Sequence, residues 1–124
     1  MVGEIVAARH LAAKIVDTYE YDLELNGLNI DVKTKSCSSE PKPRYLCSVM
    51  SYQLDNKCDG YYFVRVNLTS NEVWLLGYVS KDRLLTDGFF AKKGETDGFF
   101  TFKEDCWSIE IKDLDASPTA RSPF

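Results

Sequence analysis

Hydrophobic and polar positions along the first third of the chain follow two different periods. Residues 2–13 place apolar side chains three or four positions apart, which is the spacing of a helix. Residues 15–25 and 28–35 alternate at every second position, as strands do. Asn26-Gly27 between them is a strong signal for a two-residue hairpin turn, because both turn residues must accept positive φ. We therefore expect a helix followed by a β-hairpin.

The remaining pattern predicts further strands and one short helix. Residues 36–44 contain two prolines and several charges and are expected to form a loop. A short helix is predicted over residues 81–86, with Ser80 as its N-cap. Strands are predicted over residues 45–52, 61–67, 72–79, 99–103 and 106–112. This order predicts one α+β domain over residues 1–114, with a mixed or antiparallel sheet, an N-terminal helix and short flanking helices, followed by a flexible tail over residues 115–124.

Composition supports a folded protein and limits its classes. The chain has 124 residues, of which 44% are hydrophobic and 13% aromatic, enough for a core and well outside the disordered class. The net charge of −4 leaves no general basic footprint for nucleic acid, which argues against a passive DNA-binding module. It argues less against a metal-dependent enzyme, whose carboxylates are part of that total. No leader or membrane-spanning pattern is found, so we expect a cytoplasmic protein without membrane contact, in the host cytoplasm if it is phage-encoded.

The four cysteines are not predicted to carry the chemistry. In an intracellular protein their thiols are expected to be reduced. The sequence has no C-x-x-C pair, and its one histidine, His10, lies far from the cysteines along the chain. A structural zinc site is therefore not expected.

The hairpin register places two carboxylates opposite each other. With Asn26-Gly27 as the turn, Leu23 faces Ile30 and, one pair further, Asp22 faces Asp31. Alternation then gives a polar face made of Glu20, Asp22, Glu24, Asn29, Asp31 and Lys33. The apolar face consists of Tyr21, Leu23, Leu25, Leu28, Ile30 and Val32.

Opposed carboxylates indicate a particular chemistry. Directly opposed β-carbons lie about 4.5–5.5 Å apart, and like charges at that distance destabilise a sheet unless they share a proton or bind a cation. Oxygen ligands on a rigid hairpin suit Mg²⁺ or Mn²⁺. The Lys33 ammonium on the same face could orient a water molecule or stabilise developing negative charge. The alternative is a solvated sheet face with alternating charges, which explains Lys33 opposite Glu20 but not Asp22 opposite Asp31.

These residues also carry a family resemblance. Asp22, followed by Asp31-Val32-Lys33, resembles the D…(D/E)-x-K signature of the PD-(D/E)XK nuclease superfamily, and Glu4 resembles the additional helix acid of many members. The resemblance covers roughly residues 3–67, with Tyr21 in place of the usual proline and Asp31 in place of the commoner glutamate. It implies a restriction-endonuclease-like core, phosphodiester hydrolysis by Asp22, Asp31 and Lys33, and Mg²⁺ or Mn²⁺ held by Glu4, Asp22 and Asp31. Small members include phage endonucleases and Holliday-junction resolvases, which usually act as homodimers.

Further positions near this signature are weaker candidates. Gln53 occupies a place where some family members carry a polar residue near the metal-bound water, with an ordinary strand-end glutamine as the alternative. Lys35, Lys42 and Arg44 flank the predicted loop beside the site and are candidate DNA phosphate contacts, with a solvated loop as the alternative. Glu4 could also be a first-turn acid favoured by the helix dipole.

The leading hypothesis is therefore a Mg²⁺-dependent DNA endonuclease, with branched or other structured DNA among its candidate substrates. The alternative is a non-catalytic binding or inhibitor protein that reuses a nuclease fold, whose acidic charge fits a basic partner or mimics DNA. A third possibility is a structural component of a larger particle, which rests only on the small size of the chain.

Overall fold

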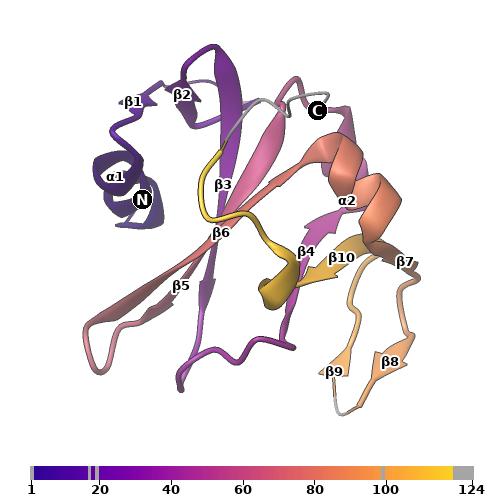
Figure 1. The fold of residues 1–124 in the computed structure, drawn as a ribbon. Helices are drawn as coiled ribbons and strands as arrows, with labels where there is room; N and C mark the ends of the chain where they lie inside the picture. The colour runs from indigo at the N-terminus through magenta and orange to yellow at the C-terminus, as the bar shows by residue number, and fades with distance from the viewer. Residues whose placement is uncertain (1, 17, 19, 99, 119–124) are drawn as a thin grey trace.

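The described residues form three sheets and two α-helices (Figure 1). The computed structural model describes residues 2–16, 18, 20–98 and 100–118. The helices are α1 (Val2–Leu11) and α2 (Lys81–Asp87), with 3-10 helices η1 (Ser51–Asp55) and η2 (Ile111–Asp113). The strands are β1 (Lys14–Ile15), β2 (Leu23–Leu25), β3 (Leu28–Ser36), β4 (Leu46–Met50), β5 (Gly60–Asn67), β6 (Glu72–Ser80), β7 (Phe89–Ala91), β8 (Thr96–Asp97), β9 (Phe100–Thr101) and β10 (Cys106–Glu110).

The largest sheet is mixed. Its five strands lie in the order β1-β2-β3-β5-β6, and only β3 and β5 are parallel. A second, antiparallel sheet has the order β4-β10-β7, and β8 pairs with β9. The predicted α+β class with a mixed sheet, an N-terminal helix and a short second helix is therefore confirmed.

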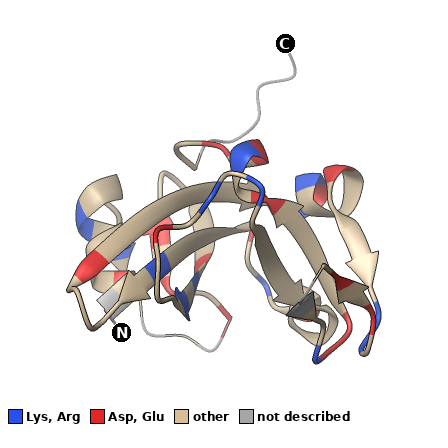
Figure 2. Cartoon of the chain, turned by 90° about the horizontal axis from the view of Figure 1, so that it is seen from below, with Lys and Arg blue, Asp and Glu red and all other residues tan. Residues whose placement is uncertain are grey.

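Both faces of the largest sheet are covered, each by a separate hydrophobic cluster. On one face Ile30 and Val32 of β3 pack with Ala7 and Ala8 of α1. On the opposite face Tyr61 and Phe63 of β5 pack against the second sheet and α2. The residues of this second cluster are Cys47, Val49, Cys58, Tyr61, Phe63, Val79, Leu84 and Ile109. Figure 2 shows the long strands as a curved layer with α1 at one end and α2 at the other. Odd-numbered side chains of β3 therefore point into the space between the two sheets.

Several predicted elements are confirmed. The strands over 61–67 and 72–79 are found as β5 and β6, and the helix over 81–86 is found as α2. Ser80 caps α2, because its hydroxyl accepts a hydrogen bond from the Arg83 N–H at 3.1 Å. Local sequence patterns are therefore sufficient to predict these two strands and this helix.

The predicted strand over 15–25 is wrong in its middle. The chain turns between β1 and β2, where the Thr18 hydroxyl accepts from the N–H of Tyr21 at 3.0 Å, and β1 folds back on β2. Tyr21 packs against the cluster on the second-sheet side instead of joining the expected apolar face. Glu20 also lies in this turn, so its predicted cross-strand pairing with Lys33 does not form.

The N-terminal helix sits very close to β3. Gly3 is buried, and a β-carbon at that position would overlap the Thr34 hydroxyl. Because glycine lacks this atom, the first turn of α1, which carries Glu4, can approach the strand.

The described end of the chain is attached to the sheet. Asp115 forms a β-bridge with Tyr78, and its carboxylate lies 2.8 Å from Arg83 of α2. The tail predicted from residue 115 is thus paired at its first residue, and residues 119–124 lie outside the described part. Within the described residues no helix has the length and apolarity needed to cross a bilayer.

Candidate active site

The candidate site lies where the hairpin of β2 and β3 stops pairing. The predicted register is confirmed, with Leu23 opposite Ile30 and Glu24 opposite Asn29. Asn26 and Gly27 both have positive φ, at 50° and 84°, as the predicted turn requires. The paired register ends at Leu23, and the Asp22 N–H donates to the carbonyl of Ile30 at 2.8 Å. The Asp22 carboxylate accepts the backbone N–H of Val32 at 2.8 Å.

The two predicted catalytic carboxyl groups meet at this point. The Asp22 carboxyl is within hydrogen-bonding reach of the Asp31 carboxyl. Burial raises the pKa of Asp22 to about 7, and the contact with Asp31 and the negative charges of Asp31 and Glu4 act in the same direction. The N–H of Val32 opposes this rise in pKa. Near neutral pH the Asp22 carboxyl is therefore partly protonated.

Lys33 is fixed in the same site by two oxygen partners. Its ammonium lies 2.8 Å from an Asp31 carboxylate oxygen and 2.7 Å from Oε1 of Gln53. The Lys33 and Asp31 side chains are only 22% and 15% exposed, so water screens the pair less than on an open surface. The ammonium also lies 6.0 Å from the centroid of the Tyr61 ring.

The position of Gln53 depends on residues far away in the sequence. Gln53 belongs to η1, which follows β4. Lys81, at the start of α2, donates to the carbonyls of Leu54 and Asn56 at 2.9 and 2.5 Å. The N–H of Ser51 donates to the carbonyl of Asp105 at 2.9 Å. These bonds hold the short helix that presents Gln53 to Lys33.

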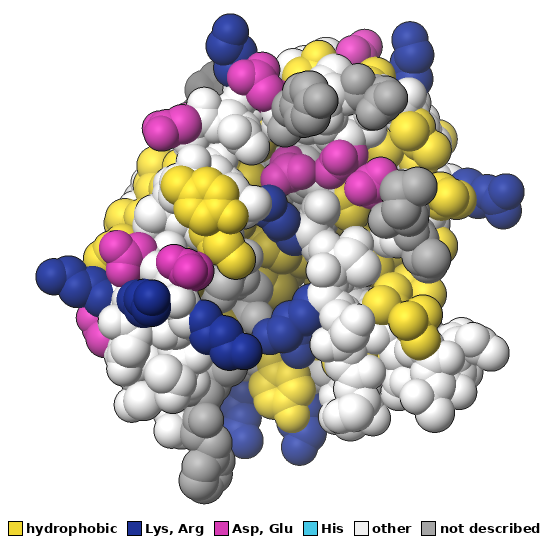
Figure 3. Space-filling model, turned by 180° about the vertical axis from the view of Figure 1, so that it is seen from behind, with side chains coloured by type: hydrophobic (Ala, Val, Ile, Leu, Met, Phe, Trp, Pro, Cys, Tyr) yellow, Lys and Arg dark blue, Asp and Glu magenta, His cyan; other side chains and the backbone are white. Residues whose placement is uncertain are grey.

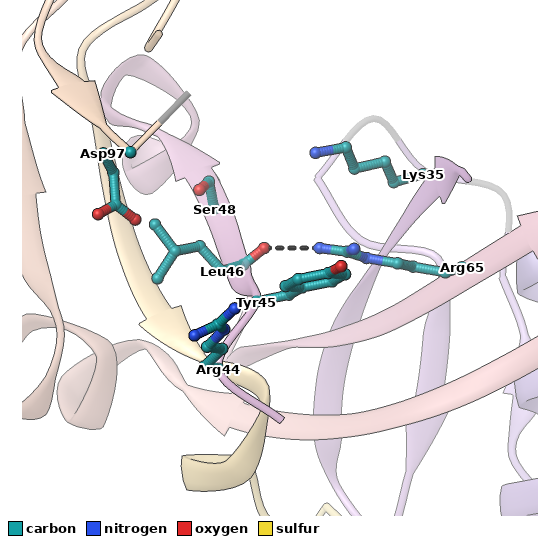
Figure 4. A pocket seen from close by; sticks show the side chains of 8 residues that line it. Lys35, Arg44, Tyr45, Leu46, Ser48, Arg65 and Asp97 are labelled. Atoms are coloured by element: carbon teal, nitrogen blue, oxygen red, sulfur yellow. Dashed lines mark hydrogen bonds between the residues drawn. The ribbon is translucent and has the colours of Figure 1, made fainter. Parts of the chain in front are cut away.

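Two adjoining cavities extend from this group between the sheets. The first, of about 320 Å³, is lined by Lys33 and Gln53 among others, and we call it the inter-sheet cavity. The second, of about 590 Å³, we call the basic pocket. It is lined by Lys35, Arg44, Tyr45, Leu46, Ser48, Arg65, Asp97 and Gly98 (Figure 4). Figure 3 shows a face of the molecule on which Lys and Arg side chains gather around a central hollow.

The predicted phosphate contacts divide into two groups. Lys35 and Arg44 line the basic pocket, whereas Lys42 is exposed in the loop before β4 and lies outside its lining. Burial lowers the pKa of Lys35, and the nearby charge of Arg65 adds to this effect.

Arg65 is a site residue that the sequence analysis does not predict. It is 8% exposed, donates to the carbonyl of Leu46 at 2.8 Å and lies 5.5 Å from the Tyr45 ring centroid. A signal was present, because an arginine inside a strand of otherwise apolar residues is rarely buried without a specific partner. Tyr45 is a second such residue, because the sequence pattern predicts only that a strand begins there.

The two carboxyl groups form an oxygen-only donor set. Among the described residues no group of three or more His, Cys, Asp or Glu side chains has the arrangement of a preformed metal site. Mg²⁺ usually keeps several waters and takes only one or two protein carboxylates together with substrate phosphate. Asp22 and Asp31 satisfy that requirement, and Glu4 lies close enough to raise the pKa of Asp22. The oxygen-only donor set therefore fits Mg²⁺ or Mn²⁺.

Comparison with known proteins gives no further assignment. No protein-family model matches the sequence, and no curated protein matches it.

Proposed function

We propose that the protein is a Mg²⁺- or Mn²⁺-dependent nuclease that hydrolyses phosphodiester bonds in DNA. The observation that carries this proposal is the meeting of Asp22 and Asp31 at the end of the hairpin, with Lys33 fixed beside them. Charge repulsion would normally separate two half-buried carboxyl groups, so their proximity favours a site that binds a cation. The helix α1, the hairpin and the parallel pair β3–β5 are consistent with a restriction-endonuclease-like core.

Each residue of the site has a role in this proposal. Asp22 and Asp31 hold the divalent cation, with Glu4 as a further acidic group. When bound, the cation supplies Lewis-acid stabilisation of charge on the scissile phosphate. Lys33 orients the attacking water or stabilises the negative charge that develops on the phosphate oxygens. Gln53 fixes the Lys33 ammonium in place.

The adjoining cavities support nucleic acid as the substrate class. Lys33 lies at the inter-sheet cavity, which shares Lys35 and Arg65 with the basic pocket. A continuous line of cations thus leads away from the carboxylates although the net charge of the chain is −4. Cations placed along a groove beside a hydrolytic site are suited to a polyanionic strand.

The direct test is a cleavage assay on several forms of DNA. Purified protein would be incubated with plasmid, linear duplex, single-stranded and four-way-junction DNA in Mg²⁺, Mn²⁺ or EDTA. We expect cleavage of at least one substrate with either metal and none in EDTA. Lys33→Ala is expected to abolish it. Cleavage that persists in EDTA or in Lys33→Ala contradicts the proposed site, and binding without cleavage supports a non-catalytic binding protein instead.

We also propose that the enzyme is a homodimer joined through β7. This strand lies at the end of the β4-β10-β7 sheet, and Phe89 and Phe90 on it are 44% and 42% exposed. Aromatic side chains on an open sheet edge favour association with a second copy. Analytical ultracentrifugation of wild type and Phe89→Ser tests this proposal. A monomer at every wild-type concentration contradicts it.

A further inference from the structure

We propose that the basic pocket binds one unpaired nucleotide of the substrate, with its phosphate held between Lys35 and Arg65. This inference rests on the nuclease function proposed above and names the form of DNA that the site accepts. It goes beyond the loop contacts expected from sequence, because Arg65 and Tyr45 are the central residues of the pocket.

The first argument is the close placement of two cations. Lys35 and Arg65 are direct partners in the parallel ladder of β3 and β5, and both line the basic pocket. Neighbouring strands are only about 4.8 Å apart, so two like charges on one face repel each other. In the basic pocket Arg65 is buried and Lys35 is exposed to solvent. A phosphate between them would offer several acceptor oxygens to the two donors.

The second argument is that the Arg65 guanidinium is already oriented. Its donation to the carbonyl of Leu46 and its position 5.5 Å from the Tyr45 ring centroid fix the plane of the group. Figure 4 shows Lys35 and Arg65 extending from β3 and β5 toward β4, with the Tyr45 ring beside the Arg65 guanidinium. The bond to Leu46 uses one of five N–H donors, and a fixed planar fork is suited to phosphate.

The third argument is the size of the pocket and its surroundings. A volume of about 590 Å³ falls within the range of about 300–1,000 Å³ that holds one small ligand. β3 and β5, β4, and the turn at Asp97 and Gly98 surround this space. A single nucleotide can enter such a recess, whereas a stacked duplex presents its phosphates on a broad outer surface. The lining contains three cations, Lys35, Arg44 and Arg65, and one carboxylate, Asp97, so it remains positive.

The pocket also lies at a useful distance from the carboxylates. Lys33 and Lys35 are on the same face of β3, about 7 Å apart at the usual strand rise. A nucleotide fixed at Lys35 and Arg65 would therefore place a neighbouring phosphodiester at Lys33 and Gln53. Aromatic and cationic side chains together are typical of surfaces that bind single strands.

The test measures binding without cleavage. Fluorescence anisotropy in EDTA would compare a labelled single-stranded oligonucleotide with a hairpin duplex of equal length. The variants are Lys35→Met, which keeps the apolar stem, and Arg65→Lys, which keeps the charge but loses the fork. Lys14→Met removes an exposed lysine from β1, away from both cavities, and is the matched charge control. Thermal melting establishes that each variant is folded.

The expected result is preference for the single strand over the duplex. Lys35→Met and Arg65→Lys should each weaken single-strand binding about tenfold, as expected for loss of a hydrogen bond to a charged group. Lys14→Met should change it less than about twofold, the scale of an exposed charge. In Lys35→Met the slope of log K against log salt should become shallower by about 0.7, the value for one phosphate of a single strand.

Three outcomes would overturn the proposal. The first is that Lys14→Met weakens single-strand binding as much as Lys35→Met does. The second is that wild type binds duplex and single strand with equal affinity. The third is that wild type binds neither. Failure of the nuclease proposal is a separate result, because it would appear as no cleavage in Mg²⁺ while the binding differences in EDTA remain.

Discussion

At the scale of single residues, the protonation of Asp22 links the candidate site to pH. Its pKa in the folded protein is about 7, compared with an ordinary value of 3.8. Ionisation is therefore less favourable in the folded state than in the unfolded chain. The stability that depends on this group is fully present below the ordinary pKa and is lost as pH rises toward the folded value.

Asp22→Asn tests that relation. Asparagine does not ionise but still offers an oxygen to the Val32 N–H, so the native contact is kept. In EDTA we expect Asp22→Asn to have a higher free energy of unfolding than wild type. The difference between the two proteins should be larger at pH 8 than at pH 5. Urea denaturation at the two pH values measures this, with Asp82→Asn on α2 as the exposed control. The same difference at both pH values would show that the pKa of Asp22 is not raised.

The individual residues differ in how far sequence could predict them. Asp22, Asp31 and Lys33 lie within one hairpin, so the turn and alternation sufficed to bring them together. Gln53 was placed only through a resemblance, and the contact with Lys33 depends on α2 holding η1. Arg65 could not be predicted because it lies in the pocket beside Lys35, its partner in the parallel ladder of β3 and β5. Parallel strands are not joined by a short turn, so no local sequence signal sets their register.

At the scale of elements, the close packing of α1 on β3 depends on Gly3. A β-carbon there would collide with the Thr34 side chain, so the helix would have to move away from the strand. Glu4 follows directly in the same turn and would move with it.

Gly3→Ala is therefore expected to lower the free energy of unfolding by about 1–3 kcal/mol, the usual cost of overpacking. The gain in helix propensity from alanine opposes this loss but is at most about 1 kcal/mol. Guanidinium denaturation measures the effect. The double variant Gly3→Ala/Thr34→Ala removes the colliding hydroxyl and should recover part of the loss. Equal stability of Gly3→Ala and wild type would mean that the helix does not sit this close.

The elements also show where local patterns fail. Residues 15–25 alternate as a strand would, but Thr18 starts a turn that the alternation does not reveal. The second sheet joins β4 to β10, which lie about half the chain apart, and no local signal specifies that pairing. Its position is nevertheless essential, because it forms the far wall of both cavities.

At the scale of the whole molecule, divalent metal is expected to stabilise the fold in a pH-dependent manner. A carboxylate must lose its proton to bind the cation, and the pKa of Asp22 is about 7. Mg²⁺ should therefore raise Tm more at pH 8 than at pH 6, since binding to the native state alone increases stability. Differential scanning fluorimetry with and without EDTA measures the shift. An equal shift at both pH values, or one that persists in Asp31→Asn, would place the metal elsewhere.

The central claim is that Asp31, with Asp22 and Lys33, forms the hydrolytic site. Its most direct test is the single-turnover cleavage rate of wild type, Asp31→Asn and the exposed control Asp82→Asn, on the DNA that wild type cleaves best, in Mg²⁺. We predict that Asp31→Asn lowers the rate about a thousandfold, on the order of what a lost electrostatic contact to the transition state costs, while Asp82→Asn retains the wild-type rate. A rate for Asp31→Asn within about threefold of wild type, less than 1 kcal/mol of barrier, would contradict the claim.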